Sequence, residues 1–353
     1  MTTMVDQTSL EDLLGRFVTD LGATIAAGNV VIGDRLGLYR ALADSGPSTS
    51  AELAARAGAA ERYVREWLRG QAASGYVSYT PDEDTYWLSE PQAVAFADPD
   101  GLALPGAFQL ALACLRDQPK IEEAIRAGHG VGWHEHDPEV FIGCERFFRP
   151  GYVANLVSSW IPAVSGLADR LTAGARVADV GCGLGSSTRI LAATYPASTV
   201  DGFDYHAESI ELARRAAADA GLADRVRFSV ASAQQFPGSD YDLITTFDCL
   251  HDMGDPVAAA RHIRGALADD GVWLLVEPFA GDQVADNLTP VGRIYYNFST
   301  FLCVPHAVAE GATDALGNQA GEQATRTVVE QAGFSRFRRA AETPFNLVYE
   351  VRR

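Results

Sequence analysis

The sequence predicts an α/β protein in which a doubly wound sheet follows an α-rich N-terminal domain. From Gly174 onward, apolar β-like runs alternate with helical stretches, as buried parallel strands and their crossover helices do. The first of these runs leads directly into a glycine-rich turn, DVGCGLGSST, at residues 179–188. Between residues 50 and 90, a helix, a turn, a second helix and a hairpin follow one another, which is the pattern of a winged helix.

Composition limits the function classes. The chain has 353 residues, 47% of them hydrophobic and 21% charged, which is sufficient for a full-sized core. The formal net charge of -18 disfavours binding to a nucleic-acid backbone. We expect a cytoplasmic protein without a membrane span, because the sequence has neither a basic N-terminal region nor a long apolar run. Five dispersed cysteines lack metal-ligand spacing and are expected to be reduced thiols.

Residues 1–98 form the predicted winged-helix domain. Its first helix carries apolar residues at helical spacing, namely Leu10, Leu13, Leu14, Phe17, Val18, Leu21 and Ile25. The stretch STSAELAARAGAAERYVREWLRG predicts a short helix, a turn at Gly58 and a longer helix. The stretch YVSYTPDEDTYWLS then predicts a hairpin around a Pro-Asp turn.

Residues 99–170 are predicted to form a helical connector and cap. A glycine-rich loop, AGHGVGWHEHDP, interrupts it and contains His129, His134 and His136. Their spacing matches no closed zinc site, so we expect no metal there. Trp133 in the same loop is a candidate for contacts with a substrate through its aromatic face, and core packing is an equal alternative.

Residues 171–353 form the predicted sheet domain. The expected β-runs are ARVADV, STVDGFDY, RVRFSVA, YDLITTF and VWLLVEPF, followed by a C-terminal pair within RFRRAAETPFNLVYEVRR. In such a sheet, ligands bind at the carboxyl ends of the strands. The turn after ARVADV therefore lies at the expected site, where glycines allow close approach to the backbone and the next helix offers free N–H groups.

The acidic residues near this turn indicate the kind of ligand. Asp179 would repel a pyrophosphate but suits a ligand with an ammonium group. The glycine spacing also places Ser186 where a dinucleotide motif requires glycine or alanine, which argues against a nicotinamide oxidoreductase. Asp204, at the end of the next β-run, can accept hydrogen bonds from both hydroxyls of a ribose.

ADVGCGLG, GFDYH, FDCLHDMGDP and the C-terminal β-runs resemble class I S-adenosylmethionine (SAM)-dependent methyltransferases over about residues 170–353. The resemblance implies a Rossmann-like, seven-stranded sheet with an antiparallel last strand, with SAM as cofactor and S-adenosylhomocysteine as product. It also implies a set of cofactor-binding residues: Tyr152, Asp179, Gly181, Gly183, Asp204, Tyr205, Ser232, Ala233, Gln234, Phe247 and Asp248. For Tyr152, in a segment similar to the helix that closes over SAM, plain packing is an equal alternative. Ser232 stands where the family often has an aspartate.

His251 is the candidate general base. A phenol is mostly protonated at neutral pH, whereas a neutral imidazole can accept its proton. FDCLHDMGDP resembles the LHDW-type segment of small-molecule O-methyltransferases, in which the histidine has this role, although Met253 replaces the tryptophan. Glu277, at the end of the next β-run, is expected to orient His251. The alternative is a histidine at the start of a helix, with Glu277 solvated.

A long insertion, residues 281–320, resembles the substrate lid of these enzymes. It contains the aromatic stretch RIYYNFSTFLCVP, and Tyr295 and Phe298 are candidates for contacts with a planar or apolar acceptor. Ordinary core packing of these side chains is the alternative.

The winged helix leaves two alternatives for partners. Similar modules in small-molecule O-methyltransferases form homodimers, and the apolar first helix fits that role. A SAM-sensing transcription regulator is the alternative, because winged helices often read DNA. Asp82, Glu83 and Asp84 at the wing tip argue against phosphate contacts. We therefore expect a homodimer that methylates a small molecule and binds neither nucleic acid nor membrane.

Overall fold

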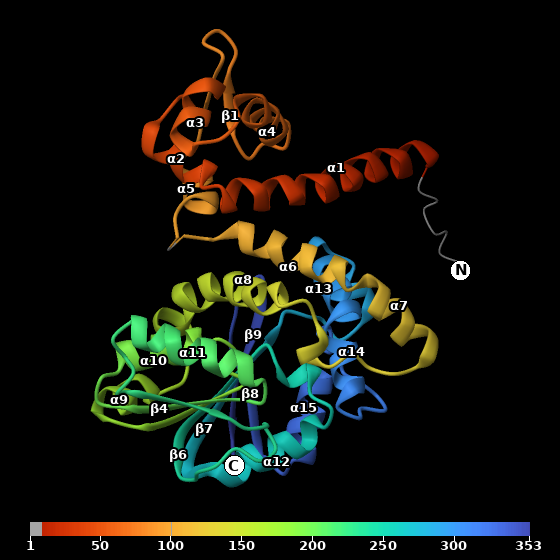
Figure 1. The fold of residues 1–353 in the computed structure, drawn as a ribbon. Helices are drawn as coiled ribbons and strands as arrows, with labels where there is room; N and C mark the ends of the chain where they lie inside the picture. The colour runs from red at the N-terminus through yellow and green to blue at the C-terminus, as the bar shows by residue number, and fades with distance from the viewer. Residues whose placement is uncertain (1–8, 100) are drawn as a thin grey trace. The chain divides into compact units, whose positions relative to one another are not determined.

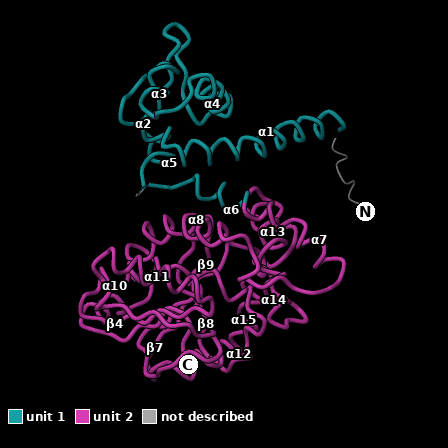
Figure 2. The backbone as a smooth tube through the Cα atoms, viewed as in Figure 1, with its two compact units in different colours: residues 1–112 teal, residues 113–353 magenta. Residues whose placement is uncertain are grey.

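The computed structural model describes residues 9–99 and 101–353. The chain divides into two compact units, residues 1–112 and 113–353 (Figure 2). The first eight residues of the predicted N-terminal domain lie outside the described residues. The division falls inside helix α6 (Leu104–Arg116), so the predicted connector, residues 99–170, contributes to both units.

The first unit contains the predicted winged helix (Figure 1). Its elements are α1 (Leu10–Arg35), α2 (Leu38–Ser45), α3 (Ser50–Ala57), α4 (Glu61–Ala73), β1 (Ser78–Thr80), β2 (Thr85–Trp87) and α5 (Glu90–Phe96). Helix α3 begins with a capping box, in which Thr49 and Glu52 satisfy each other's backbone N–H groups. Strands β1 and β2 pair antiparallel and form the wing.

The core of the first unit is built around packed aromatic rings. The ring centroid of Tyr39 lies 5.1 Å from those of both Trp67 and Phe96. The N-terminal part of α1 does not contribute to this core. Its seven apolar side chains from Leu10 to Ile25 are 50% to 70% exposed, an extent that marks an interaction surface.

The second unit is an α/β domain. Its helical elements are α7 (Gln118–Ala127), η1 (Trp133–Glu135), α8 (Glu139–Asn155), η2 (Leu156–Trp160), α9 (Leu167–Ala173), α10 (Ser186–Thr194), α11 (Ala207–Asp219), η3 (Leu250–Asp252), α12 (Pro256–Ala266), η4 (Val284–Asn287), α13 (Pro290–Phe301), α14 (Cys303–Ala309) and α15 (Gly321–Gln331). Its strands are β3 (Arg176–Val180), β4 (Thr199–Asp204), β5 (Val226–Val230), β6 (Tyr241–Phe247), β7 (Leu267–Pro278), β8 (Arg336–Glu342) and β9 (Asn346–Arg352).

These strands form one seven-stranded sheet in the order β5-β4-β3-β6-β7-β9-β8. The first five pair in parallel, whereas the last strand of the chain, β9, is antiparallel to both β7 and β8. The predicted sheet with an antiparallel last strand is therefore confirmed. Strand order reverses between β3 and β6, which is where a doubly wound sheet opens a crevice at its carboxyl edge.

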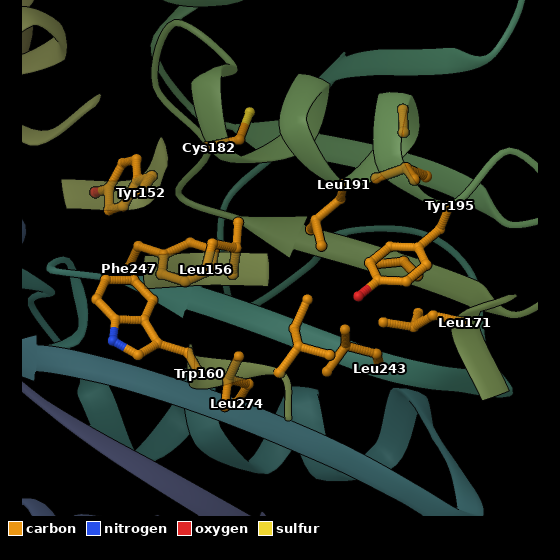
Figure 3. Packing of buried hydrophobic residues seen from close by; sticks show 14 of the residues in the cluster. Tyr152, Leu156, Trp160, Leu171, Cys182, Leu191, Tyr195, Leu243, Phe247 and Leu274 are labelled. Atoms are coloured by element: carbon orange, nitrogen blue, oxygen red, sulfur yellow. The ribbon is translucent and has the colours of Figure 1, made fainter. Parts of the chain in front are cut away.

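Helices cover both faces of the sheet. On one face, residues of α8, η2, α9, α10 and α11 pack against side chains such as Val177 and Leu274. On the other, α12 and α15 pack against Ile244 and Trp273. Figure 3 shows part of the packing on the first of these faces, where the ring centroids of Trp160 and Phe247 lie 6.1 Å apart. Within the described residues, no helix is long and apolar enough to cross a membrane.

Candidate functional site

The glycine-rich turn joins β3 to α10 and has a backbone that only glycine adopts readily. Gly181 and Gly183 have φ angles of 74° and 51°. A Cβ at Gly181 would lie 2.6 Å from the Cys249 sulfur, whereas a Cβ at Gly183 would meet nothing within 4 Å. Helix α10 begins after Gly185 without a side-chain cap. The turn therefore presents bare backbone, and the first N–H groups of α10 have no capping side chain.

Asp204, at the end of β4, is fixed beside this turn. Its two carboxylate oxygens accept hydrogen bonds from the backbone N–H groups of Gly183 and His206, each at 2.9 Å. Burial raises the pKa of Asp204 above its ordinary value. Because each oxygen can accept more than one hydrogen bond, the carboxylate can still bind hydroxyl groups of a ligand.

A cavity of about 400 Å³ opens at this edge of the sheet. Its walls come from the turn after β3, the ends of β4, β5 and β6, helix α8, and helix α14 with the residue that follows it. Ten of the eleven predicted cofactor-binding residues line it: Tyr152, Gly181, Gly183, Asp204, Tyr205, Ser232, Ala233, Gln234, Phe247 and Asp248. Trp133 also lines the cavity.

Asp179 is the predicted cofactor-binding residue that does not line the cavity. Its side chain is fully buried behind the turn and accepts hydrogen bonds from the hydroxyls of Ser187, Thr188 and Thr245, at 2.6, 2.6 and 2.8 Å. Burial raises its pKa, and these hydroxyls oppose that rise. The position that suggested a ligand contact instead connects β3 to α10 and β6.

The cavity wall carries one sign of charge. Five carboxylates line it, those of Glu145, Asp204, Asp248, Asp252 and Glu310, and its lining residues include no lysine or arginine. Burial and the charges of neighbouring carboxylates raise the pKa of Asp252 to about 7. Burial also raises the pKa values of Asp204 and Asp248, and a cationic ligand in the cavity would favour the ionised forms of these carboxyls.

Asp248 has the most unusual backbone of these five. It follows β6 with a φ of 51°, a strained conformation for a residue other than glycine. Asn346 donates a hydrogen bond to its Oδ1 at 2.8 Å, whereas its Oδ2 is buried without a hydrogen-bond partner. Burial and the Glu277 carboxylate raise the pKa of Asp248 well above its ordinary value, and a cation in the cavity would favour its ionised form.

His251 and Glu277 are brought together, as their positions at adjacent strand ends suggested. The His251 Nδ1 lies 2.7 Å from Glu277 Oε2, and Glu277 Oε1 accepts a hydrogen bond from the backbone N–H of Leu250 at 3.0 Å. Both side chains are buried, and neither lines the cavity. Burial alone would lower the pKa of His251, but the Glu277 carboxylate and the Cys303 thiol raise it well above its ordinary value.

The remaining predicted residues lie elsewhere. Tyr295 is buried and donates a hydrogen bond to the carbonyl of Phe345, and Phe298 packs near Phe147, so neither lines the cavity. In the histidine-containing loop, the buried His136 pairs with Asp117 at 3.1 Å. Tyr295 is a buried side chain, whereas Phe298 is only partly buried.

Four cavity-lining residues with a carboxylate or imidazole side chain were not predicted: Glu145, Asp252, His306 and Glu310. Asp252 directly follows His251, and Glu145 lies on the same helix as Tyr152. The sequence therefore identified both segments but not these two side chains. His306, on α14, stacks on Tyr205 with ring centroids 5.5 Å apart. Burial lowers the pKa of His306 to about 4, and neighbouring histidines contribute to this shift.

Two family models match the chain. The one described as "Rv2258c-like winged HTH domain" matches residues 23–97, and the one described as "Methyltransferase domain" matches residues 171–333. Among curated proteins, methyltransferase GfsG of Streptomyces halstedii is 30% identical over 138 residues, which cover 38% of this chain and 49% of that protein. The chain spans about half or less of the length of the first curated relatives that it matches.

Solved structures share the whole fold. An O-methyltransferase family protein from Burkholderia thailandensis superposes with a TM-score of 0.70 at 19% identity, over 98% of each chain. Human N-acetylserotonin methyltransferase in complex with SAM gives a TM-score of 0.70 at 17% identity, over 100% of this chain and 99% of that one. The two family models and the sheet topology therefore identify residues 171–333 as a methyltransferase domain and residues 23–97 as a winged-helix domain of the Rv2258c-like type.

Proposed function

We propose that this protein transfers a methyl group from SAM to a small aromatic or apolar acceptor, with an oxygen as the favoured methylated atom. The observation that carries the proposal is the acidic cavity at the carboxyl edge of the sheet, with the His251–Glu277 pair directly behind one of its walls. Asp248, Cys249 and Asp252, on either side of His251 in the chain, line that wall.

The residues of the cavity fit SAM. Gly181 and Gly183 give the methionine part access to the backbone, and Asp204 would accept hydrogen bonds from the ribose hydroxyls. Tyr205, Ser232, Ala233 and Gln234 would surround the adenine, and Tyr152, Phe247 and Asp248 would adjoin the sulfonium end. The buried, unpartnered Oδ2 of Asp248 favours a positively charged ligand in this space. When bound, SAM supplies a methyl group activated by its sulfonium.

The protein's own contribution is alignment and removal of a proton. In-line methyl transfer depends on holding the acceptor atom against the methyl group, and positioning can supply much of the rate. His251 would accept the acceptor's proton, while Glu277 fixes its ring and stabilises the imidazolium that results. Trp133, in the cavity wall, offers an aromatic face for a planar acceptor.

The exposed apolar side of α1 supports a homodimer formed through the N-terminal domain. Seven apolar side chains that are at least half exposed on one helix are an unusual surface for a monomer. Replacing Leu14 and Phe17 by glutamate should convert dimers to monomers in sedimentation experiments. A wild-type chain that sediments as a monomer would refute the dimer.

A SAM-sensing regulator is the weaker proposal. Asp82, Glu83 and Asp84 are exposed at the turn of the wing, where a DNA-binding wing needs to approach phosphates. On the recognition-type helix α4, Arg62 and Arg65 pair with Glu66 and Glu61 of the same helix. Both observations favour an enzyme over a DNA-binding protein.

Calorimetric titration with SAM, followed by a radiolabelled-methyl screen, tests the proposal. The screen should compare phenols, amines, thiols and duplex DNA as acceptors or partners. We expect SAM binding and label transfer to a phenol. Absence of SAM binding would refute the cofactor assignment, and SAM binding without transfer, together with sequence-specific DNA binding, would favour the regulator.

A further inference from the structure

The burial of Asp179 leaves the ammonium group of SAM without the partner that the sequence suggested. Asp179 is fully buried behind the glycine-rich turn, and three hydroxyls already occupy it. The binding partner of an ammonium group must instead line the cavity. This inference rests on the proposed function and concerns the methionine end of the same cavity.

Glu145, on α8, is the cavity-lining carboxylate that lies against the start of α10. The Ser186 hydroxyl, at the first residue of α10, donates a hydrogen bond to Glu145 Oε1. Arg189, one turn further along the same helix, donates to the same oxygen at 3.2 Å. Glu145 is also one of the residues that form the cavity wall.

Arg189 supports this carboxylate from behind. Its guanidinium also donates to Ser186 Oγ at 3.3 Å and to the backbone carbonyl of Gly185 at 3.1 Å, and it does not line the cavity. The guanidinium is therefore attached to the end of the glycine-rich turn and to the first turn of α10. Its fork geometry holds Glu145 Oε1 in place.

We propose that Glu145 binds the α-ammonium group of SAM, with Arg189 as its positioning residue. The geometry joins the helix that covers the cavity, α8, to the turn on which the methionine part rests. A charge-assisted hydrogen bond between the ammonium and Glu145 would connect α8 to the amino-acid part of the ligand. Asp248, at the end of β6, would then face the sulfonium side.

Three ligands separate the possible contacts in calorimetric titrations of the full chain. SAM carries the ammonium, the carboxylate and the sulfonium, decarboxylated SAM lacks only the carboxylate, and 5′-methylthioadenosine, an uncharged thioether, lacks all three. We expect Glu145→Gln to weaken both SAM and decarboxylated SAM by roughly 10- to 100-fold, as loss of a hydrogen bond to a charged group does. Binding of 5′-methylthioadenosine should change by less than about 2-fold, because it makes no contact with Glu145.

Arg189 provides the test of positioning. Arg189→Ala should weaken SAM and decarboxylated SAM in the same pattern but by less, roughly 3- to 10-fold, and Arg189→Lys should restore part of the loss. Glu139→Gln, on the same helix but outside the cavity wall, is the matched control and should leave all three affinities unchanged. If Arg189 only stabilised the local structure, Arg189→Ala would weaken the binding of all three ligands to a similar extent.

Specific results would overturn the assignment. If Glu145→Gln bound SAM more tightly, Glu145 would be a competitor for the site of the SAM carboxylate. If Asp248→Asn weakened S-adenosylhomocysteine, which keeps the ammonium but lacks the sulfonium, and Glu145→Gln did not, Asp248 would be the ammonium partner. Both results leave SAM binding by the wild type intact, whereas a wild type that binds no SAM refutes the proposed function itself.

Discussion

The ends of β3 and β6 lie next to each other in the sheet but are organised in opposite ways. At the end of β3, Asp179 is saturated by three hydroxyls, and the turn that follows is open to the cavity. At the end of β6, Asp248 has a strained backbone and a buried oxygen without a partner, and His251 is paired with Glu277 behind the wall. The polar groups of the first region are therefore satisfied within the fold, whereas the second region retains strained, unsatisfied and titratable groups, which are common at functional sites.

The largest expected effect comes from the β6 side. If His251 is the proposed base, His251→Ala should lower turnover by roughly 10²–10⁴ with a phenol of ordinary acidity, while SAM affinity stays nearly unchanged, because the base acts on the acceptor and not on the cofactor. Single-turnover rates and calorimetry on the same preparation measure the two quantities. If His251→Ala turned over within a few-fold of wild type, His251 would not be the general base, and only the assignment of the cofactor site would remain.

The next effect belongs to the β3 side and concerns stability. Asp179→Ala should lower the free energy of unfolding by about 3 kcal/mol, because it leaves the buried hydroxyls of Ser187, Thr188 and Thr245 without their acceptor. Denaturant unfolding measures this loss. SAM affinity of the folded variant should change by no more than about 3-fold. A stable Asp179→Ala variant that has lost SAM binding would restore the direct contact that the sequence suggested.

A smaller effect concerns the pH dependence of activity. Glu277 raises the pKa of His251, and the base must be neutral to accept a proton, so the acid limb of kcat/KM should lie above the ordinary imidazole pKa of about 6.5. Glu277→Gln removes the carboxylate and should move this limb to lower pH, with a lower plateau because the ring is less well oriented. The two titrations are coupled, so the limb reports the pair.

The stability consequence of the same pair has a definite sign. Because the folded-state pKa of His251 is raised, the pair stabilises the fold fully below the unfolded pKa of about 6.5, and this contribution is lost as pH rises through the higher folded value. Thermal unfolding of wild type and Glu277→Gln across this range should therefore converge at high pH. If the acid limb of kcat/KM did not move in Glu277→Gln, Glu277 would not influence the pKa of the catalytic base.

The sequence was sufficient for the sheet but not for the orientation of every side chain. The alternating apolar runs predicted the strands, and the glycine-rich turn predicted the edge of the sheet at which the cavity lies, because strand ends in a parallel sheet meet at one edge. The resemblance to class I methyltransferases implied the antiparallel end and most of the residues of the cavity wall. Period-2 alternation did not reveal that Asp179 would meet hydroxyls from α10 and β6. The sequence did not predict Glu145 because the orientation of its side chain depends on how α8 packs against the sheet, which is a property of the tertiary structure.

The aromatic insertion shows the same limit. Tyr295 and Phe298 have the composition of an acceptor site, yet the first is buried with its hydroxyl bonded to Phe345 and the second packs near Phe147. His306, just beyond the aromatic stretch, reaches the cavity instead. Apolar composition indicates that a side chain is buried. Only the fold shows whether it packs against other protein side chains or against a ligand.

The central claim is that the turn after β3 and the carboxylate after β4 bind SAM, and calorimetric titration of wild type beside Asp204→Ala tests it most directly. Losing the hydrogen bonds to the ribose should weaken SAM by on the order of 1.5–3 kcal/mol, which is roughly 10- to 150-fold in the dissociation constant. Circular dichroism should show both proteins equally folded at the titration temperature. An unchanged dissociation constant in a folded Asp204→Ala variant would contradict the account.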